Sequence, residues 1–260
     1  MNRDSTWRAL RALGTRVYPT HISRITNHAI ATATLALLLT ALPAAAGEAE
    51  WKMLHDQAAA HLQRSSLPQA ELFAREALKE AESSLGPDHR ATEQSLSTLA
   101  LALRLQGKQE EALPFAQRLV AVRTRHYGAD DPATGIALHN NAEILIAQGR
   151  LEEAAKLEGR ALAIFQKKLG TNHFNTAAAL HNLGAISLKQ ENYREAEKYL
   201  RRALAAKEKS LKPGHLSLAH TLDNLSAALA AQGRQLEADK FRRQAEAIRR
   251  KAGSVQNQKS

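Results

Sequence analysis

The 260-residue sequence contains no cysteine, which excludes disulfide bonds, thiolate metal sites, cysteine nucleophiles and cysteine-linked lipid anchors. Aromatic residues make up only 4% of the chain, so a hydrophobic core must be built mainly from Ala and Leu. Proline and glycine are also scarce and fall mostly between apolar stretches. The residues that dominate instead, Ala, Leu, Glu, Lys, Arg and Gln, are good helix formers. The composition therefore predicts an all-α protein.

Short enzyme motifs are absent as well. The sequence has no H-E-x-x-H, G-x-S-x-G, Walker A or Gly-rich dinucleotide motif. Its paired acids, such as Glu110-Glu111 and Glu152-Glu153, stand where helices are predicted to begin. Acids at those positions favour the helix dipole and need no catalytic role. We therefore expect a protein without enzymatic activity and without a cofactor.

The formal net charge of +10 is distributed unevenly along the chain. Residues 1–46 carry five arginines and a single acid, Asp4, whereas the remainder holds 31 basic and 25 acidic residues. A surplus of this size favours solubility and acidic partners only weakly. Few aromatic side chains are present to stack on bases, so the sequence does not favour a nucleic-acid partner.

The N-terminal segment combines a basic leader, an uncharged run AIATATLALLLTAL at 29–42, and a small-x-small sequence that ends at Ala46. These are the three parts of a secretory signal. The apolar run is shorter than the roughly 20 residues that a transmembrane helix needs. We therefore expect residues 1–46 to be a signal peptide and the protein to be periplasmic or secreted. An uncleaved membrane anchor at 29–46 and an Arg-rich organelle transit peptide are the alternatives.

From residue 49 onward the sequence repeats with a period of 42 residues. Three series of positions show it: Ala70, Ala112, Ala154, Ala196 and Ala238; Ala77, Leu119, Ala161, Ala203 and Ala245; Leu54, Leu96, Leu138, Leu180 and Leu222. A fixed period in this range predicts stacked units, none of which can bury its apolar face alone. The units are expected at about 49–86, 91–128, 133–170, 175–212 and 217–252, within a domain at 47–252. The polar segment 253–260 is expected to be disordered.

Each unit is predicted to contain two antiparallel helices. In the second unit Leu96, Leu99 and Leu103 lie on one helical face, and a second apolar stripe follows from Ala112. Gly107 stands between them, and glycine suits the left-handed turn that closes a helix. In the fourth unit Glu191 replaces this glycine, and Asn192 is expected to adopt the left-handed conformation instead.

Three segments, GKQEEALPFAQRLVAV, GRLEEAAKLEGRALAI and ENYREAEKYLRRALAA, resemble the second helix of tetratricopeptide repeats. LHNNAEIL, LHNLGAIS and LDNLSAAL resemble the first helix, and the joints GPDH, GADDP and GTNH with the 42-residue spacing resemble the kinesin-light-chain subtype. The resemblance covers about residues 49–252. It implies a right-handed superhelical α-solenoid of about five units that binds other proteins.

One series of polar residues is expected to face the concave surface. Position 98 points away from the packed face of its helix, and its repeats are Thr98, Asn140, Asn182 and Asn224. Amides at regular intervals can bond the N–H and C=O groups of an extended peptide, and in resembling tetratricopeptide domains these asparagines bind peptides. We therefore predict a peptide-binding groove at these positions and at the flanking residues His139, His181 and Asp223. Repeat consensus without a ligand is the alternative explanation.

Histidines on neighbouring repeats lie roughly 10 Å apart, so His139 and His181 are not expected to share a metal ion. The joint histidines His89, His173 and His215 are interpreted as turn packing. The alternative to groove binding is a structural subunit of a cell-envelope complex that is held by its convex or terminal surfaces. The sequence leaves the partner protein and the oligomeric state open, and a membrane is involved only if the N-terminal segment is uncleaved.

Overall fold

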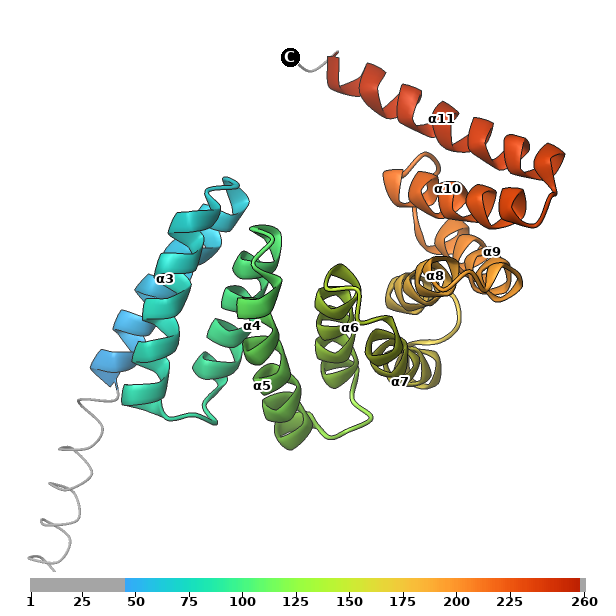
Figure 1. Ribbon diagram of the computed structural model, residues 1–260. Coiled ribbons are helices and arrows are strands. Elements are labelled where there is room, and N and C mark those ends of the chain that lie inside the picture. Colours follow the sequence, from blue (N-terminus) through green and yellow to red (C-terminus); the bar gives the residue numbers. More distant parts are fainter. Residues whose placement is uncertain (1–44, 258–260) are drawn as a thin grey trace, which may run out of the picture.

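A computed structural model describes residues 45–257, and all of its regular elements are helices (Figure 1). Residues 1–44 of the predicted signal peptide lie outside this range. The first helix occupies residues 45–63 of the described part. The helices that follow are α3 (Leu67–Glu80), α4 (Arg90–Leu105), α5 (Gln109–Tyr127), α6 (Pro132–Ala147), α7 (Leu151–Leu169), α8 (Phe174–Lys189), α9 (Tyr193–Ser210), α10 (Leu216–Ala231) and α11 (Gln235–Asn257). A short π-helical turn, Ala81–Leu85, extends α3.

The helices form consecutive pairs that stack along the chain, as Figure 1 shows from blue to red. α4 packs against α5, α6 against α7, α8 against α9 and α10 against α11. Each second helix also packs against the first helix of the following pair, and the first helices α6, α8 and α10 contact one another in sequence. The expected all-α solenoid of stacked helix pairs is confirmed.

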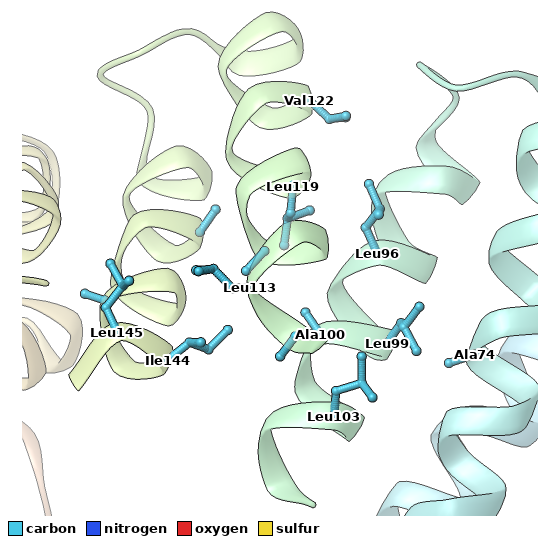
Figure 2. Close-up of a cluster of buried hydrophobic side chains, with 14 of the residues drawn as sticks. Ala74, Leu96, Leu99, Ala100, Leu103, Leu113, Leu119, Val122, Ile144 and Leu145 are labelled. Carbon is cyan, nitrogen blue, oxygen red and sulfur yellow. The ribbon is translucent and has the colours of Figure 1, made fainter. Parts of the chain in front are cut away.

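The core consists of small and aliphatic side chains at the repeating positions. Ala112, Ala154 and Ala196 are fully inaccessible to solvent, which lets the two helices of a pair approach closely. Figure 2 shows how the cluster continues from one pair to the next, with side chains from α3, α4, α5 and α6 in contact: Ala74, Leu96, Leu99, Ala100, Leu103, Leu113, Leu119, Val122, Ile144 and Leu145. Because no pair buries its apolar face alone, the stacking itself supplies the hydrophobic stabilisation.

The tight turns inside the pairs contain one residue with a positive φ angle. Gly107 has φ of 77° and Gly149 has φ of 75°. In the fourth pair Glu191 adopts this conformation, with φ of 61°, whereas Asn192 has φ of −82°. The expectation that Asn192 takes the left-handed role is therefore wrong. The reason is geometric, because the turn requires the left-handed residue at one fixed distance from the preceding helix.

The joints between pairs cap the next helix. Nδ1 of His89, His173 and His215 accepts a hydrogen bond from the backbone N–H two residues further on, at 3.1 Å in each case. Asp131 does the same at the equivalent joint, where its Oδ1 accepts from Ala133 at 2.8 Å. The joint histidines therefore act as N-caps, which satisfy backbone donors that a helix start leaves without partners.

The two ends of the solenoid differ. In the first pair Ala58 is fully buried, and Trp51 Nε1 donates to Ser95 Oγ of α4 at 2.8 Å, so this pair is attached to the second. At the other end α11 continues to Asn257, whereas the sequence placed the end of the helix near residue 252. Helix extension past Gly253 adds one backbone bond per residue to an existing helix, which requires no new nucleus. Within residues 45–257 no helix is long and apolar enough to cross a membrane.

Candidate functional site

A small pocket lies between α4, α5 and α6, on the side of the first helices. Its volume is about 70 Å³, and its walls are formed by Ser97, Ala100, Leu101, Arg104, Ala116, Leu119, Ala137, Asn140 and Ile144. Asn140 is half-buried there, and within the described part of the chain its amide has no hydrogen-bond partner. The pocket thus combines an apolar wall with an amide that is free to bind a ligand.

Arg104 contributes a positive charge to the same pocket. Its guanidinium lies 3.2 Å from a carboxylate oxygen of Glu143, one unit further along. Both side chains are about one-third exposed, at 29% and 32%. The ion pair partly neutralises Arg104, so the pocket is not a site for a bare carboxylate.

His139, beside Asn140 in the sequence, points into the protein and contacts a buried acid. Its Nδ1 lies 2.7 Å from Oε1 of Glu158, a residue of α7 whose side chain is fully inaccessible to solvent. Burial lowers the pKa of His139, but the hydrogen bond and the charge of Glu158 outweigh it and raise this pKa overall. Burial raises the pKa of Glu158, and the contact with His139 opposes that shift.

Asn182 lies on the other side of the same carboxyl group. The neighbouring Asn182 amide favours the ionised form of Glu158, yet Nδ2 of Asn182 and Oε2 of Glu158 both lack a hydrogen-bond partner of good geometry. Glu158 is therefore held between α6 and α8 with only one of its two oxygens bonded. The middle member of the predicted asparagine series faces this buried acid.

His181 belongs to a second interior polar group, together with Thr221 of α10 and Lys207 of α9. Thr221 Oγ1 lies 3.1 Å from His181 Nδ1 and accepts a hydrogen bond from Lys207 Nζ at 2.8 Å. Burial, and then the positive charge of Lys207, lower the pKa of His181 to about 3. Burial lowers the pKa of Lys207 to about 8. The histidine is therefore neutral at physiological pH.

The remaining predicted residues take separate positions. Asp223 forms an ion pair with Arg249 of α11. Asn224 and Thr98 are half-buried, and neither is among the residues that line the pocket around Asn140. The seven predicted residues are thus not gathered in one pocket. Asn140 lines the pocket, His139 and Asn182 meet at Glu158, and His181 meets Lys207.

Glu158 and Lys207 were not among the predicted site residues, although the repeat contains a signal for Glu158. Glu158 stands in register with Ala74, Ala116 and Leu200, whereas the position of Lys207 also holds Arg123 and Arg249. An ionisable residue at a position that other units fill with apolar side chains indicates a buried polar contact. No group of three or more His, Cys, Asp and Glu side chains in the described range is arranged to hold a metal ion.

Comparison with protein families identifies the repeat. The family model described as tetratricopeptide repeat matches residues 52–125, 110–167, 133–209 and 175–251, which together span most of the chain. The chain belongs to the tetratricopeptide repeat family. The curated proteins that were compared contain no significant match to this tetratricopeptide repeat protein.

Solved structures of similar shape carry the same kind of repeat. A putative kinesin light chain from Podosopora anserina with nearly identical TPR-like repeats is 24% identical, with a TM-score of 0.65 over 78% of this chain and 96% of its own. BtubC (BKLC) from P. vanneervenii is 21% identical, with a TM-score of 0.68 over 90% of this chain and 93% of its own. The predicted kinesin-light-chain-like subtype is confirmed.

A third structure is that of a Rap protein complexed with Competence and Sporulation Factor. It is 16% identical, with a TM-score of 0.60 over 76% of this chain and 54% of its own. At these identities the structural likeness establishes the fold of the tetratricopeptide repeat protein and nothing finer. The fold supports a protein–protein interaction scaffold.

Proposed function

We propose that this protein is an exported interaction scaffold that binds an extended segment of a partner protein along its first helices. The observation that carries the proposal is the pocket at Asn140, where an unpaired amide stands beside apolar walls. Such an amide can bond the N–H or C=O of a peptide backbone, while the apolar wall accepts a side chain. A volume of about 70 Å³ limits that side chain to a small aliphatic one.

The buried polar contacts refine the predicted binding mode. Asn182 faces Glu158, so its amide contacts a buried carboxyl group and is not free to bind a ligand. Asn140 and Asn224, by contrast, have no side-chain hydrogen bond within the described residues. Peptide contact is therefore proposed at Asn140 first, with Asn224 as a second contact further along. The complex of a Rap protein with Competence and Sporulation Factor supports the idea that this kind of fold can bind another molecule.

The proposal is tested with a crosslinked pull-down from the native host. Wild type is compared with Asn140→Ala, with the triple variant Asn140→Ala, Asn182→Ala and Asn224→Ala, and with the control Asn172→Ala. Asn172 lies exposed in the joint before α8, so this control removes an amide without touching the groove. We expect at least one partner to be recovered with wild type and the control and to be lost with both groove variants.

The alternative is a structural subunit of an envelope complex that is held by other surfaces. In that case all four baits recover the same partners, and the groove proposal is wrong. A circular dichroism spectrum of each variant is required, because the triple variant alters the surroundings of Glu158. A partner lost only with the triple variant would indicate a folding defect if that variant had also lost helical signal.

A further inference from the structure

A second hollow lies on a different side of the solenoid, between the second helices α5 and α7. It has a volume of about 410 Å³, and α6 forms its floor. Leu138, Asn141 and Leu145 come from the floor, whereas Gln117 and Val120 come from α5. Glu153, Lys156, Leu157 and Arg160 come from α7. This hollow shares no residue with the Asn140 pocket, so its occupant would bind independently.

Asn141 is the unusual residue of this hollow. The equivalent positions in the second, fourth and fifth units hold Leu99, Leu183 and Leu225, which are all buried, whereas the first unit has the exposed Gln57. Asn141 is only 4% exposed, and its Oδ1 is buried without a hydrogen-bond partner. Nδ2 likewise has no partner in the described part of the chain, yet it is not enclosed, so it faces the hollow. An acceptor group on a ligand can bond the Nδ2 donor, whereas Oδ1 stays buried without a partner.

The charges around the hollow select a ligand of one sign. Lys156 and Arg160 are exposed, stand one helical turn apart on α7, and form no salt bridge within the described residues. Glu153 is the acid on the same wall, and it is already occupied by Arg150 through two hydrogen bonds of 2.8 and 2.7 Å. Asp130 lies near enough to Arg160 to interact with its charge, as Glu153 does with Lys156, but neither acid forms a salt bridge with these cations. Two exposed cations beside an amide donor complement a carboxylate.

We propose that the hollow between α5 and α7 receives an acidic side chain, Asp or Glu, from a partner protein. The carboxylate accepts a hydrogen bond from Asn141 Nδ2 and lies close to Lys156 and Arg160. The adjoining stem of the ligand packs on Leu138, Leu145 and Leu157. The scaffold thereby carries a second docking surface, which does not depend on the groove at Asn140.

The repeat provides a matched control. Lys198 and Arg202 occupy the positions of Lys156 and Arg160 one unit further along, are equally exposed, and lie near Leu183 in place of Asn141. Replacing Lys156 and Arg160 with Ala therefore changes the net charge by the same amount as replacing Lys198 and Arg202. Asn141→Leu introduces the residue found in the second, fourth and fifth units and removes a buried polar atom that has no partner, so this variant is expected to fold at least as stably as wild type.

The test is selection of random twelve-residue peptides, displayed on phage, against the full chain. Peptides retained by wild type and lost with Asn141→Leu should share an Asp or Glu. Synthetic copies should bind at least tenfold more weakly to Asn141→Leu and to Lys156→Ala with Arg160→Ala. Exchange of the peptide's acid for its amide should have the same effect. Affinity for the Lys198→Ala with Arg202→Ala control, and for Asn140→Ala, should stay within twofold of wild type.

The proposal is overturned if no selected peptide distinguishes wild type from Asn141→Leu. It is also overturned if the amide form of the peptide binds as tightly as the acid form, because the cations would then have no role. Equal weakening by the two pairs of cation replacements would show general charge attraction without a site. Loss of binding with Asn140→Ala would place the peptide in the groove at Asn140.

Discussion

Histidines at equivalent positions of two units lie in different electrostatic surroundings inside the solenoid. His139 and His181 stand one repeat apart on α6 and α8, yet their environments shift their pKa values in opposite directions. His139 contacts the carboxylate of Glu158, whereas His181 lies near the positive charge of Lys207. The same residue type in the same register therefore has two different electrostatic roles, which makes the pH dependence of stability a test at this scale.

Replacing His181 with Gln should change how stability depends on pH. The folded-state pKa of His181 is lowered to about 3, against 6.5 for the ordinary side chain. Below pH 6.5 His181 is protonated in the unfolded chain but stays neutral in the folded chain. The free energy of unfolding therefore decreases as the pH falls towards 3. Between about pH 7.5 and about pH 5, wild type should lose about 1–2 kcal/mol more than His181→Gln in urea unfolding.

The same measurement on His139→Gln provides an internal control with the opposite sign. The folded-state pKa of His139 is raised, so its stabilising contribution is present below the unfolded pKa and lost as the pH rises through the folded one. Wild type should therefore gain stability relative to His139→Gln when the pH is lowered over that interval. If the two variants showed the same pH dependence, the assigned surroundings of the two histidines would be incorrect.

At the scale of single helices and turns, backbone conformation and close packing decide which residues are tolerated. The fourth pair places a glutamate where the second, third and fifth pairs have glycine, and α8 contains a glycine at its contact with α9. Both positions depart from what intrinsic propensity favours. Glu191 is strained in a backbone conformation that suits glycine. Gly184 has low helix propensity but allows a close contact between α8 and α9.

Glu191→Gly should stabilise the protein. Glu191 has φ of 61°, a left-handed conformation that costs a residue with a Cβ atom roughly 1–2 kcal/mol. Glycine removes this strain but is more flexible in the unfolded chain, so the net gain should be about 0.5–1 kcal/mol in urea unfolding. The reverse exchange, Gly149→Ala at φ of 75°, should destabilise by a comparable amount. If the free energy of unfolding were unchanged in both variants, the left-handed conformation assigned to these two positions would be incorrect.

Gly184→Ala should destabilise the protein even though Ala is the better helix former. A Cβ at Gly184 would lie 2.6 Å from Cγ of Leu200, whose side chain is fully buried and would have to shift within the packed core. Overpacking of this kind costs about 1–3 kcal/mol, which exceeds the gain of about 1 kcal/mol in helix propensity. Gly159→Ala on α7 meets nothing within 4 Å and should stabilise instead. Thermal unfolding of the two variants should shift in opposite directions.

At the scale of the whole molecule, the chain is a linear stack in which pairs contact their sequence neighbours. Stability in such a stack is close to a sum of unit and interface contributions. The polar groups at Glu158 and Lys207 lie at interfaces between pairs and therefore help to couple adjacent units. The two proposed docking surfaces lie around the same central pairs, one at α4–α6 and the other at α5–α7.

Export is a prediction about the whole chain. If residues 1–46 are a cleaved signal, the intact mass of the protein from its native host corresponds to a chain that begins at Gly47. The protein with this mass should be found in the fraction released from the cell envelope, because a basic leader and an apolar run that act as a signal direct translocation before they are removed. A mass that begins at Met1 in the membrane fraction would favour the uncleaved anchor, and one in the cytosol would exclude export.

Sequence alone was sufficient for the helices, their pairing and the family, for a physical reason. Helix propensity, turn glycines and the 42-residue period depend on contacts that are local or that join adjacent units, and these contacts recur from one unit to the next. The period therefore located the small residues at the close approaches, such as Ala112 and Ala154. It also located the turn at residue 191, although not the residue that bears its left-handed conformation.

The arrangement of the polar side chains was decided by tertiary structure. His139, Glu158 and Asn182 come from three different helices, and their meeting depends on the rotation of each helix in its interface. Spacing along one helix predicted an outward direction for Asn182, but the packing of α8 against α7 places its amide beside the buried carboxyl group of Glu158. The sequence thus determined which residues repeat, whereas packing between helices determined which of them face a ligand and which face one another.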